Sequence, residues 1–335
     1  MPAHPTIWAI CCTTGSRKRP PGFGRPPGRS TFAIVHRNLA TAYAHRKPAA
    51  DIDRAIAELE KAISLDRKYP LHFAELDELY EQAGIAIEKR LPLFEKNRDV
   101  VAQRDDAQNR AVALKVAAGK YDEAIQMMTG RKFAVAEGAN LNVAEHWASA
   151  HILRGQQSLA ARRYKEAIAY FEAALEVPDN LPMRGPGSMG PRNAEVAYLI
   201  GLAYEGFGDQ TKATESWTRG SAPPQSAGRR GGATAAPGVG QSFFQARCMQ
   251  QIGQTAQAAA MFRSLLETGQ RALDQPAPAE SAVQSPRLRA ANAHYTMGLG
   301  YLGLGDAPKA KTEFSEAVPT SPDLLGARTA LATVK

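Results

Sequence analysis

The chain has 335 residues, of which 44% are hydrophobic, and a formal net charge of +8. Five basic residues and no acidic residue lie within residues 1–31, so subtracting their charge leaves only +3 for the rest of the chain. This nearly neutral body gives little support to nucleic-acid binding, and no nucleic-acid partner is expected. No apolar run approaches the roughly 18 residues of a transmembrane helix, so membrane insertion is not expected.

The three cysteines, Cys11, Cys12 and Cys248, do not form a disulfide framework, and adjacent cysteines make no normal metal pair. They predict a reducing compartment, with the cytoplasm as the default. Residues 7–12 are the only apolar run near the start and no basic residue precedes them, which makes a poor signal peptide.

Residues 10–31 are rich in Pro and Gly and show no helical period, so they are predicted to be disordered as written. A helical pattern then begins abruptly at His36. A reading-frame fault is the alternative, because one set of synonymous codons for residues 10–16, entered at the third base, encodes Leu-Leu-Tyr-Asp-Arg-Lys. That segment is typical of the end of a first helix in the repeats described below.

Further along, apolar residues recur at helical spacing on successive pairs of helices. The first pair carries them at Leu39, Ala40 and Tyr43 and then at Ala55, Leu59 and Ala62. The second pair carries Phe73, Leu76, Tyr80 and Gly84 on its first helix. Its second helix, residues 89–101, lacks a small residue at the expected crossing, and Pro92 is expected to shift or kink it.

Internal recurrence supports a repeat most directly in the middle of the chain. The segment GKYDEAI at residues 119–125 returns as RRYKEAI at residues 162–168, and each is followed by a large apolar residue, Met128 or Phe171. These segments predict a third pair near residues 108–130 and a fourth near residues 151–179. Pro and Gly then predict a loop over residues 181–192.

The fifth pair has its characteristic residues at Ala197, Gly201, Tyr204, Gly208, Asp209, Ala213 and Trp217. A flexible insertion of Ala, Gly, Pro and Ser follows at residues 221–240. A sixth pair is predicted around residues 243–268, followed by a loop near residues 274–286. Residues 324–332 are predicted to form a short terminal helix that covers the last apolar face.

The last complete pair, residues 294–322, shows the fullest pattern: His294, Met297, Gly298, Tyr301, Gly305, Asp306, Ala310, Phe314, Ala317 and Pro322. We expect Gly298 and Ala310 to face each other where the two helices cross. Asp306 is expected to cap the second helix, and Pro308 to lie in its first turn, where a missing N–H group costs nothing.

This pattern closely resembles the tetratricopeptide repeat (TPR), a helix–turn–helix unit of 34 residues. The resemblance implies an all-α fold, a right-handed superhelical TPR solenoid of about seven helix–turn–helix repeats. The chain then divides into an N-terminal segment (1–31), repeats one to four (32–180), a loop (181–192), repeat five (193–220), a linker (221–240), and repeats six and seven with a capping helix (241–335).

A narrower resemblance covers residues 32–332. The segments 73–80, 95–97, 104–106, 130–133 and 137–138 look like parts of large bacterial TPR proteins in which a β-rich domain of unknown function precedes the repeats. If that resemblance holds, this chain is the C-terminal repeat part of a longer protein. Only the general TPR positions are specific.

Other motifs were weighed for chemistry, and none supports a cofactor, a metal or an enzyme. Residues 298–303 match the dinucleotide fingerprint Gly-x-Gly-x-x-Gly, but they fall inside a predicted helix, whereas the fingerprint needs a strand followed by a helix start. His146 and His151 are five residues apart and diverge on a helix, so they do not match a zinc motif.

Two further motifs were rejected as catalytic candidates. Adjacent Asp105 and Asp106 point apart on a helix, so they do not form an acid–base pair. Ser188 lacks the strand that precedes a nucleophile elbow.

In resembling proteins, positions two, five, nine and twelve of each unit line the concave groove of the solenoid. The corresponding residues here are Ile152 and Gln156 in the fourth unit, Glu195, Tyr198, Leu202 and Glu205 in the fifth, and Asn292, Tyr295, Leu299 and Leu302 in the seventh. A groove with aliphatic, aromatic and carboxylate groups is expected to bind an extended peptide or a helix of a protein partner.

Two alternatives remain open. One is an unoccupied spacer surface, and the other is an accessory segment of a larger, carbohydrate-related bacterial protein whose β-rich domain is absent here.

Overall fold

The computed structural model of the chain describes residues 29–46, 49–134, 142–181, 192–223, 238–275 and 286–334. These residues form sixteen α-helices and no β-strand, which confirms the predicted all-α class. The helices are α1 (Arg29–Ala44), α2 (Ile52–Leu65), α3 (Leu71–Ala83), α4 (Ile87–Lys96), α5 (Arg98–Val101), α6 (Asp105–Ala117), α7 (Tyr121–Thr129), α8 (Val143–Ala160), α9 (Tyr164–Ala173), α10 (Asn193–Phe207), α11 (Gln210–Ser221), α12 (Val239–Gln251), α13 (Thr255–Asp274), α14 (Pro286–Gly303), α15 (Ala307–Thr320) and α16 (Leu325–Thr333).

Within the described residues, the helices form seven successive pairs: α1/α2, α3/α4, α6/α7, α8/α9, α10/α11, α12/α13 and α14/α15. Helix α5 is a single turn after α4, and α16 ends the chain as predicted. The buried apolar residues form four successive clusters, each spanning neighbouring pairs, rather than one central core. This arrangement is that of a solenoid, in which each unit packs on its neighbours.

A glycine on the first helix and an aromatic ring on the second form the crossing in three of the pairs. A Cβ atom added at the glycine would approach the ring to 2.5 Å for Gly155 and Phe171, 2.1 Å for Gly201 and Trp217, and 2.4 Å for Gly298 and Phe314. The aromatic side chains are fully buried. The ring of Phe314, rather than Ala310, therefore lies nearest to Gly298, because the missing side chain leaves space for a whole ring edge.

The turn of the seventh pair has the predicted geometry. Gly305 adopts a left-handed φ of 86°, which favours glycine. Asp306 then caps α15 by accepting a hydrogen bond from the backbone N–H of Lys309 at 3.2 Å. Pro308 lies in the first turn of α15, where its missing donor leaves no bond unmade.

The second pair departs from the prediction, because the helix expected over residues 89–101 is divided into α4 and α5. Pro92 lies inside α4 and removes one backbone donor. The division falls at Asn97, whose side-chain amide donates to the carbonyl oxygen of Leu93 at 2.7 Å. This side-chain bond competes with the continuing helix for the last carbonyl groups of α4.

At the N-terminal end, α1 begins at Arg29, seven residues before His36, so the last residues of the segment expected to be disordered are helical. Residues 1–28 lie outside the described part of the chain. Most of the predicted loop 181–192 and of the insertion 221–240 lie outside it too, as do residues 276–285 between α13 and α14.

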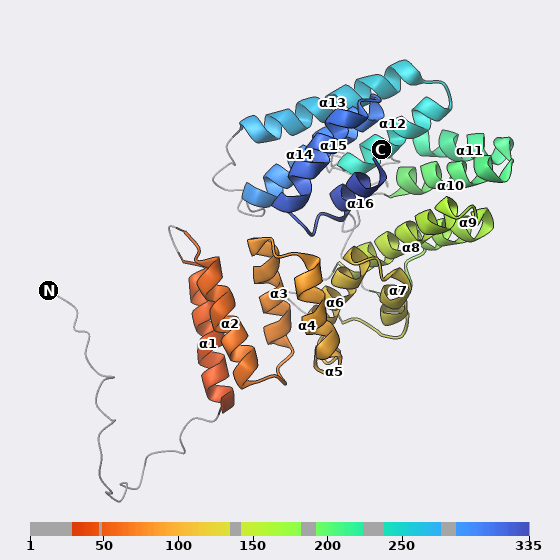
Figure 1. The fold of residues 1–335 in the computed structure, drawn as a ribbon. Coiled ribbons are helices and arrows are strands. Elements are labelled where there is room, and N and C mark those ends of the chain that lie inside the picture. Colours follow the sequence, from red (N-terminus) through yellow and green to blue (C-terminus); the bar gives the residue numbers. More distant parts are fainter. Residues whose placement is uncertain are drawn as a thin grey trace, which may run out of the picture.

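The pairs follow a curved path that brings the C-terminal helices back beside α3, α4 and α6 (Figure 1). Several side-chain contacts bridge this return. Asp323 pairs with Arg90 at 2.6 Å, Arg328 pairs with Glu88 at 3.3 Å, and Arg287 donates to the carbonyl oxygen of Gln82 at 3.4 Å. The solenoid therefore closes on itself around the surface on which the candidate site lies.

Candidate functional site: the inner surface of the solenoid

The predicted groove residues lie on α8, α10 and α14, the first helices of their pairs. Ile152, Tyr198 and Leu299 are buried, Glu205 is exposed, and Gln156, Glu195, Leu202, Asn292, Tyr295 and Leu302 are partly buried. Glu195 of the fifth unit lies near enough to Tyr295 of the seventh unit for its charge to act on the Tyr295 phenol. Burial raises the pKa of the Tyr295 phenol, and the nearby carboxylate of Glu195 raises it further.

A chain of charged side chains includes Glu195. Arg192, at the start of α10, donates to Glu195 at 2.5 Å and also pairs with Glu145 of α8. The same guanidinium reaches the hydroxyl of Ser149 at 3.3 Å. Arg192 therefore connects α8 to α10, and its two carboxylate partners hold it in one orientation.

The charged chain continues toward the N-terminal units. Arg110 of α6 pairs with Glu81, with Glu78 at 3.4 Å and with Asp77 at 3.5 Å, all on α3. On α8, burial lowers the pKa of His146 to about 4; the positive charge of Arg110 lowers it further, while Glu81 acts in the opposite direction. We call the surface formed by these residues, from Asp77 on α3 to Tyr295 on α14, the inner surface.

The buried ion pair of Arg90 and Asp77 anchors one end of the inner surface. Arg90 donates through Nε and Nη2 to the two carboxylate oxygens of Asp77, at 2.8 and 2.9 Å, and both residues are 1% exposed. The sequence interpretation missed this pair. A signal was present, because Asp77 and Arg90 occupy helical positions where the apolar period of their helices predicts hydrophobic residues.

Tyr198, predicted for the groove, is committed to the packing between α10 and α12. Its hydroxyl accepts hydrogen bonds from Arg247, at 2.7 Å from Nη2 and 3.2 Å from Nε. The ring of Phe244 lies 5.8 Å away between centroids. A substitution of Tyr198 is therefore expected to affect stability as well as any binding.

The motifs rejected for chemistry have structural roles. Gly298, Gly300 and Gly303 lie inside α14, where added Cβ atoms would meet Phe314, Leu266 and Phe262 at 2.4, 2.6 and 2.2 Å. They are helix-packing positions and do not open a helix toward a phosphate.

The acidic and histidine motifs are also explained by local contacts. Asp105 accepts from Arg131 and from the backbone of Ala134, each at 2.8 Å. His151 is buried beside Trp147 and Tyr170. In the part of the chain that the structure describes, no group of three or more His, Cys, Asp or Glu residues is placed to hold a metal ion. Ser188 lies outside the described residues.

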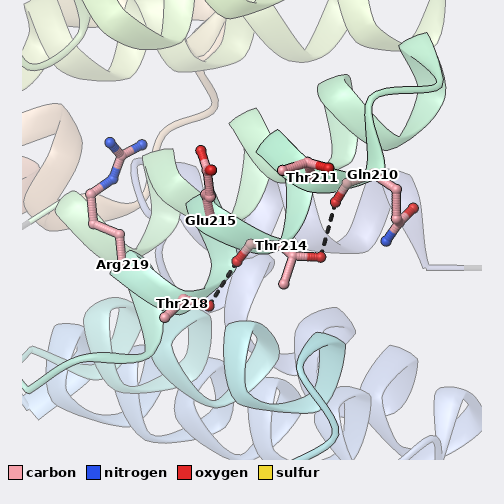
Figure 2. A pocket seen from close by; sticks show the side chains of 6 residues that line it. All are labelled: Gln210, Thr211, Thr214, Glu215, Thr218 and Arg219. Carbon is pink, nitrogen blue, oxygen red and sulfur yellow. Dashed lines mark hydrogen bonds between the residues drawn. The ribbon is translucent and has the colours of Figure 1, made fainter.

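A second hollow lies on the surface of a single helix and lacks the apolar and aromatic groups found on the inner surface. It is lined by Gln210, Thr211, Thr214, Glu215, Thr218 and Arg219, all from α11 (Figure 2). The hydroxyls of Thr214 and Thr218 donate to carbonyl oxygens one turn earlier in the same helix, at 2.9 and 2.8 Å. This surface is formed by one helix, and both of these hydroxyls are already engaged within it.

The fold and the repeating glycine–aromatic crossings define a TPR-type α-solenoid. No protein-family model and no curated protein matches this sequence. In the part of the chain that the structure describes, every helix is too short or too polar to cross a membrane.

Several solved structures are similar in fold. A tetratricopeptide repeat protein from Parabacteroides merdae shares 13% identity at a TM-score of 0.45, over 91% of this chain and 98% of that one. The segment of MamA from Desulfovibrio magneticus that starts at its residue 41 shares 16% sequence identity at a TM-score of 0.37, over 56% of this chain and 91% of that one. PilF from Pseudomonas aeruginosa shares 16% sequence identity at a TM-score of 0.38, over 72% of this chain and 93% of that one. At these identities the likeness concerns the fold alone.

Proposed function

We propose that the protein is a non-catalytic interaction scaffold that holds a peptide or helical segment of a protein partner against its inner surface. The observation that carries this proposal is the row of oriented, partly buried charges formed by Arg110, Glu145, Arg192 and Glu195. Charged groups fixed in a sheltered concave surface can recognise a complementary segment without first being ordered.

The inner surface also carries the apolar contacts that a bound segment needs. Leu202, Tyr295 and Leu302 remain partly accessible between the charged positions. Aliphatic and aromatic contacts supply affinity, while the flanking charges select sequence and orientation. This combination matches the way that solenoid grooves accommodate an extended peptide or an amphipathic helix.

Site-specific photo-cross-linking tests the proposal. A benzophenone amino acid is placed at Gln156 or at Leu302 on the inner surface, and at Thr214 in the hollow on α11 as a control (Figure 2). The expected result is capture of the same protein from both inner positions and none from Thr214. Equal capture from Thr214 would contradict binding on the inner surface.

The accessory-segment function is supported by a different observation. Phe32, Val35 and Leu39, at 50%, 50% and 41% exposure, form an apolar stripe along one face of α1. Such a stripe is the kind of surface on which a neighbouring unit packs. The genomic sequence upstream tests this candidate. A continuous frame encoding a β-rich domain supports the larger protein, and a stop codon immediately upstream contradicts it.

A further inference from the structure

The C-terminal end of the chain crosses the inner surface. After α15, residue Asp323 accepts a hydrogen bond from Nη1 of Arg90 at 2.6 Å, although the two residues are 233 positions apart. The other side of the Arg90 guanidinium is held by Asp77. Asp323 therefore completes the pairing of a buried cation that belongs to the second helical pair.

Helix α16 then contacts two separate parts of the solenoid, the middle units and the last two pairs. Leu325 packs against the apolar cluster of α6, α7 and α8, which includes Val112 and Trp147. Leu331 and Val334 pack against the cluster of α12 to α15. The helix thus spans the space between the early and late units, in agreement with its central position in Figure 1.

This path places α16 over a predicted groove residue. A Cβ atom added at Gly326 would lie 2.5 Å from the hydroxyl oxygen of Tyr295, so the backbone of α16 rests on that side chain. Arg328 reaches the carbonyl oxygen of Ala117 at 3.5 Å from the same helix. Helix α16 therefore occupies part of the surface assigned above to a partner.

The attachment is of a kind that can be exchanged. Helix α16 has nine residues, of which Ala327 alone is fully buried, and helices of this length are not stable in isolation. Its ion pair between Arg328 and Glu88 joins side chains that are 25% and 69% exposed, and such pairs contribute little. Asp77 would still neutralise Arg90 after α16 left.

We propose that residues 321–334 are a built-in occupant of the inner surface, and that a partner binds by replacing them with a segment of the same chemistry. That segment is a short helix with a carboxylate residue just before its first turn and a leucine two residues later, matching Asp323 and Leu325. This proposal rests on the proposed function, since it concerns the same surface.

Tethering explains why residues 321–334 occupy the inner surface when no partner is bound. A segment joined to its site by a short connection acts at an effective concentration of about millimolar, so a free peptide at micromolar concentration is excluded. Weakening the tethered copy should therefore raise the affinity for an added copy. This relation gives the proposal a direct test.

The probe is a fluorescein-labelled synthetic peptide of residues 321–334, titrated into the full chain and followed by anisotropy. Arg328→Glu weakens the attachment of the chain's own α16, and Thr333→Glu, on an exposed residue of the same helix, is the matched control. We expect the Arg328→Glu chain to bind the peptide severalfold more tightly than the wild-type and Thr333→Glu chains, because the substitution removes one exposed ion pair and places two carboxylates side by side. Replacing Asp323 by Asn or Leu325 by Ala in the peptide should reverse that gain.

A second measurement keeps the test decisive if Arg328→Glu releases α16 only partly. Peptide binding should speed hydrogen exchange of the amides in the chain's own α16, which mass spectrometry reports separately when the synthetic peptide is uniformly labelled with heavy isotopes. Equal binding to all three chains, or binding unaffected by the two peptide substitutions, overturns the proposal, as does an absence of binding to a helical Arg328→Glu chain.

The two proposals can fail separately. If cross-linking from Gln156 and Leu302 still captures a partner while the peptide result is negative, the inner surface remains the binding surface and only the role of α16 is lost. If the inner positions capture nothing in either the wild-type or the Arg328→Glu chain, the proposed function itself is wrong.

Discussion

In the pairs α8/α9, α10/α11 and α14/α15 the helices cross over a glycine and an aromatic ring, whereas α3 and α4 are joined across a buried ion pair. The glycine crossing is complete within one pair, as for Gly201 and Trp217. The ion pair is not, because Arg90 has a third donor that is satisfied by Asp323 at the far end of the chain. The apolar crossing therefore stabilises a unit, and the polar crossing also connects distant units.

The largest expected effect comes from breaking the ion pair on one side. Arg90→Met removes the cation and leaves the carboxylate of Asp77 buried, with Arg110 at 3.5 Å as its remaining partner. The loss of one member of a buried pair costs about 3 to 5 kcal/mol of unfolding free energy. Urea denaturation monitored by circular dichroism measures this loss.

The matched control is the double variant Asp77→Leu, Arg90→Met, in which neither member of the buried pair is left without the other and only the partly exposed Asp323 loses its partner. It should cost clearly less than the single variant, because two apolar groups of similar size can replace a buried pair. A double variant as unstable as the sum of its single variants would show that the two residues do not act as a pair.

An apolar crossing should respond to volume instead of charge. In Gly201→Leu, the new side chain would start 2.1 Å from the indole of Trp217 and force α10 and α11 apart. Overpacking at such a site is expected to cost about 3 kcal/mol. Gly240→Ala is the control, because a Cβ atom there meets nothing within 4 Å. Equal stability of the two variants would refute the close crossing at Gly201.

The sequence predicted the glycine side of the apolar crossings because their chemistry is local, although it placed Ala310 instead of Phe314 opposite Gly298. Gly201 and Trp217 lie sixteen positions apart, and the same spacing recurs at Gly155 and Phe171 and again at Gly298 and Phe314. A repeated spacing can be read without knowing how the solenoid curves. The helix pairs and the cap at Asp306 were predictable for the same reason.

The connections between distant units could not be predicted in this way. Asp323 is at none of the characteristic positions of the repeat, and its partner Arg90 is recognisable only as a polar residue at an apolar position. Which carboxylate meets which guanidinium depends on the small rotation that accumulates from unit to unit. For this reason the predicted groove positions included Glu195 but not its partner Arg192 or the ion pairs of Arg110, and did not anticipate α16 against Tyr295.

His151 is a buried polar residue without a charged partner, and so differs from both the glycine–aromatic crossings and the Arg90–Asp77 ion pair. In α8, His151 is 6% exposed, and neither ring nitrogen has a hydrogen-bond partner among the described residues. Burial lowers its pKa to about 4, below the ordinary value of 6.5. The unfolded chain therefore takes up a proton as pH falls through 6.5 while the folded chain does not, so stability is lost on acidification.

The expected loss attributable to His151 between pH 6.5 and pH 5 is about 1.5 kcal/mol. It is measured as the difference between the wild-type protein and His151→Phe, which keeps a ring beside Trp147 and Tyr170 but cannot titrate. Other histidines contribute equally to both proteins and cancel. Parallel pH profiles for the two proteins would mean that His151 is protonated in the folded state or solvated there.

The smallest expected loss of stability comes from removing the charge of Asp323, the more distant of the two carboxylates that pair with Arg90. Asp323→Asn weakens the distant partner while the bidentate contact with Asp77 remains, and the side chain of Asp323 is already 22% exposed. The expected cost is about 1 kcal/mol, well below that of Arg90→Met, because no charge is left buried alone. Asp99→Asn, whose side chain is 95% exposed, is the control and should change stability by less than about 0.5 kcal/mol. A cost for Asp323→Asn as large as that for Arg90→Met would mean that closure of the solenoid, rather than the local ion pair, holds the second unit together.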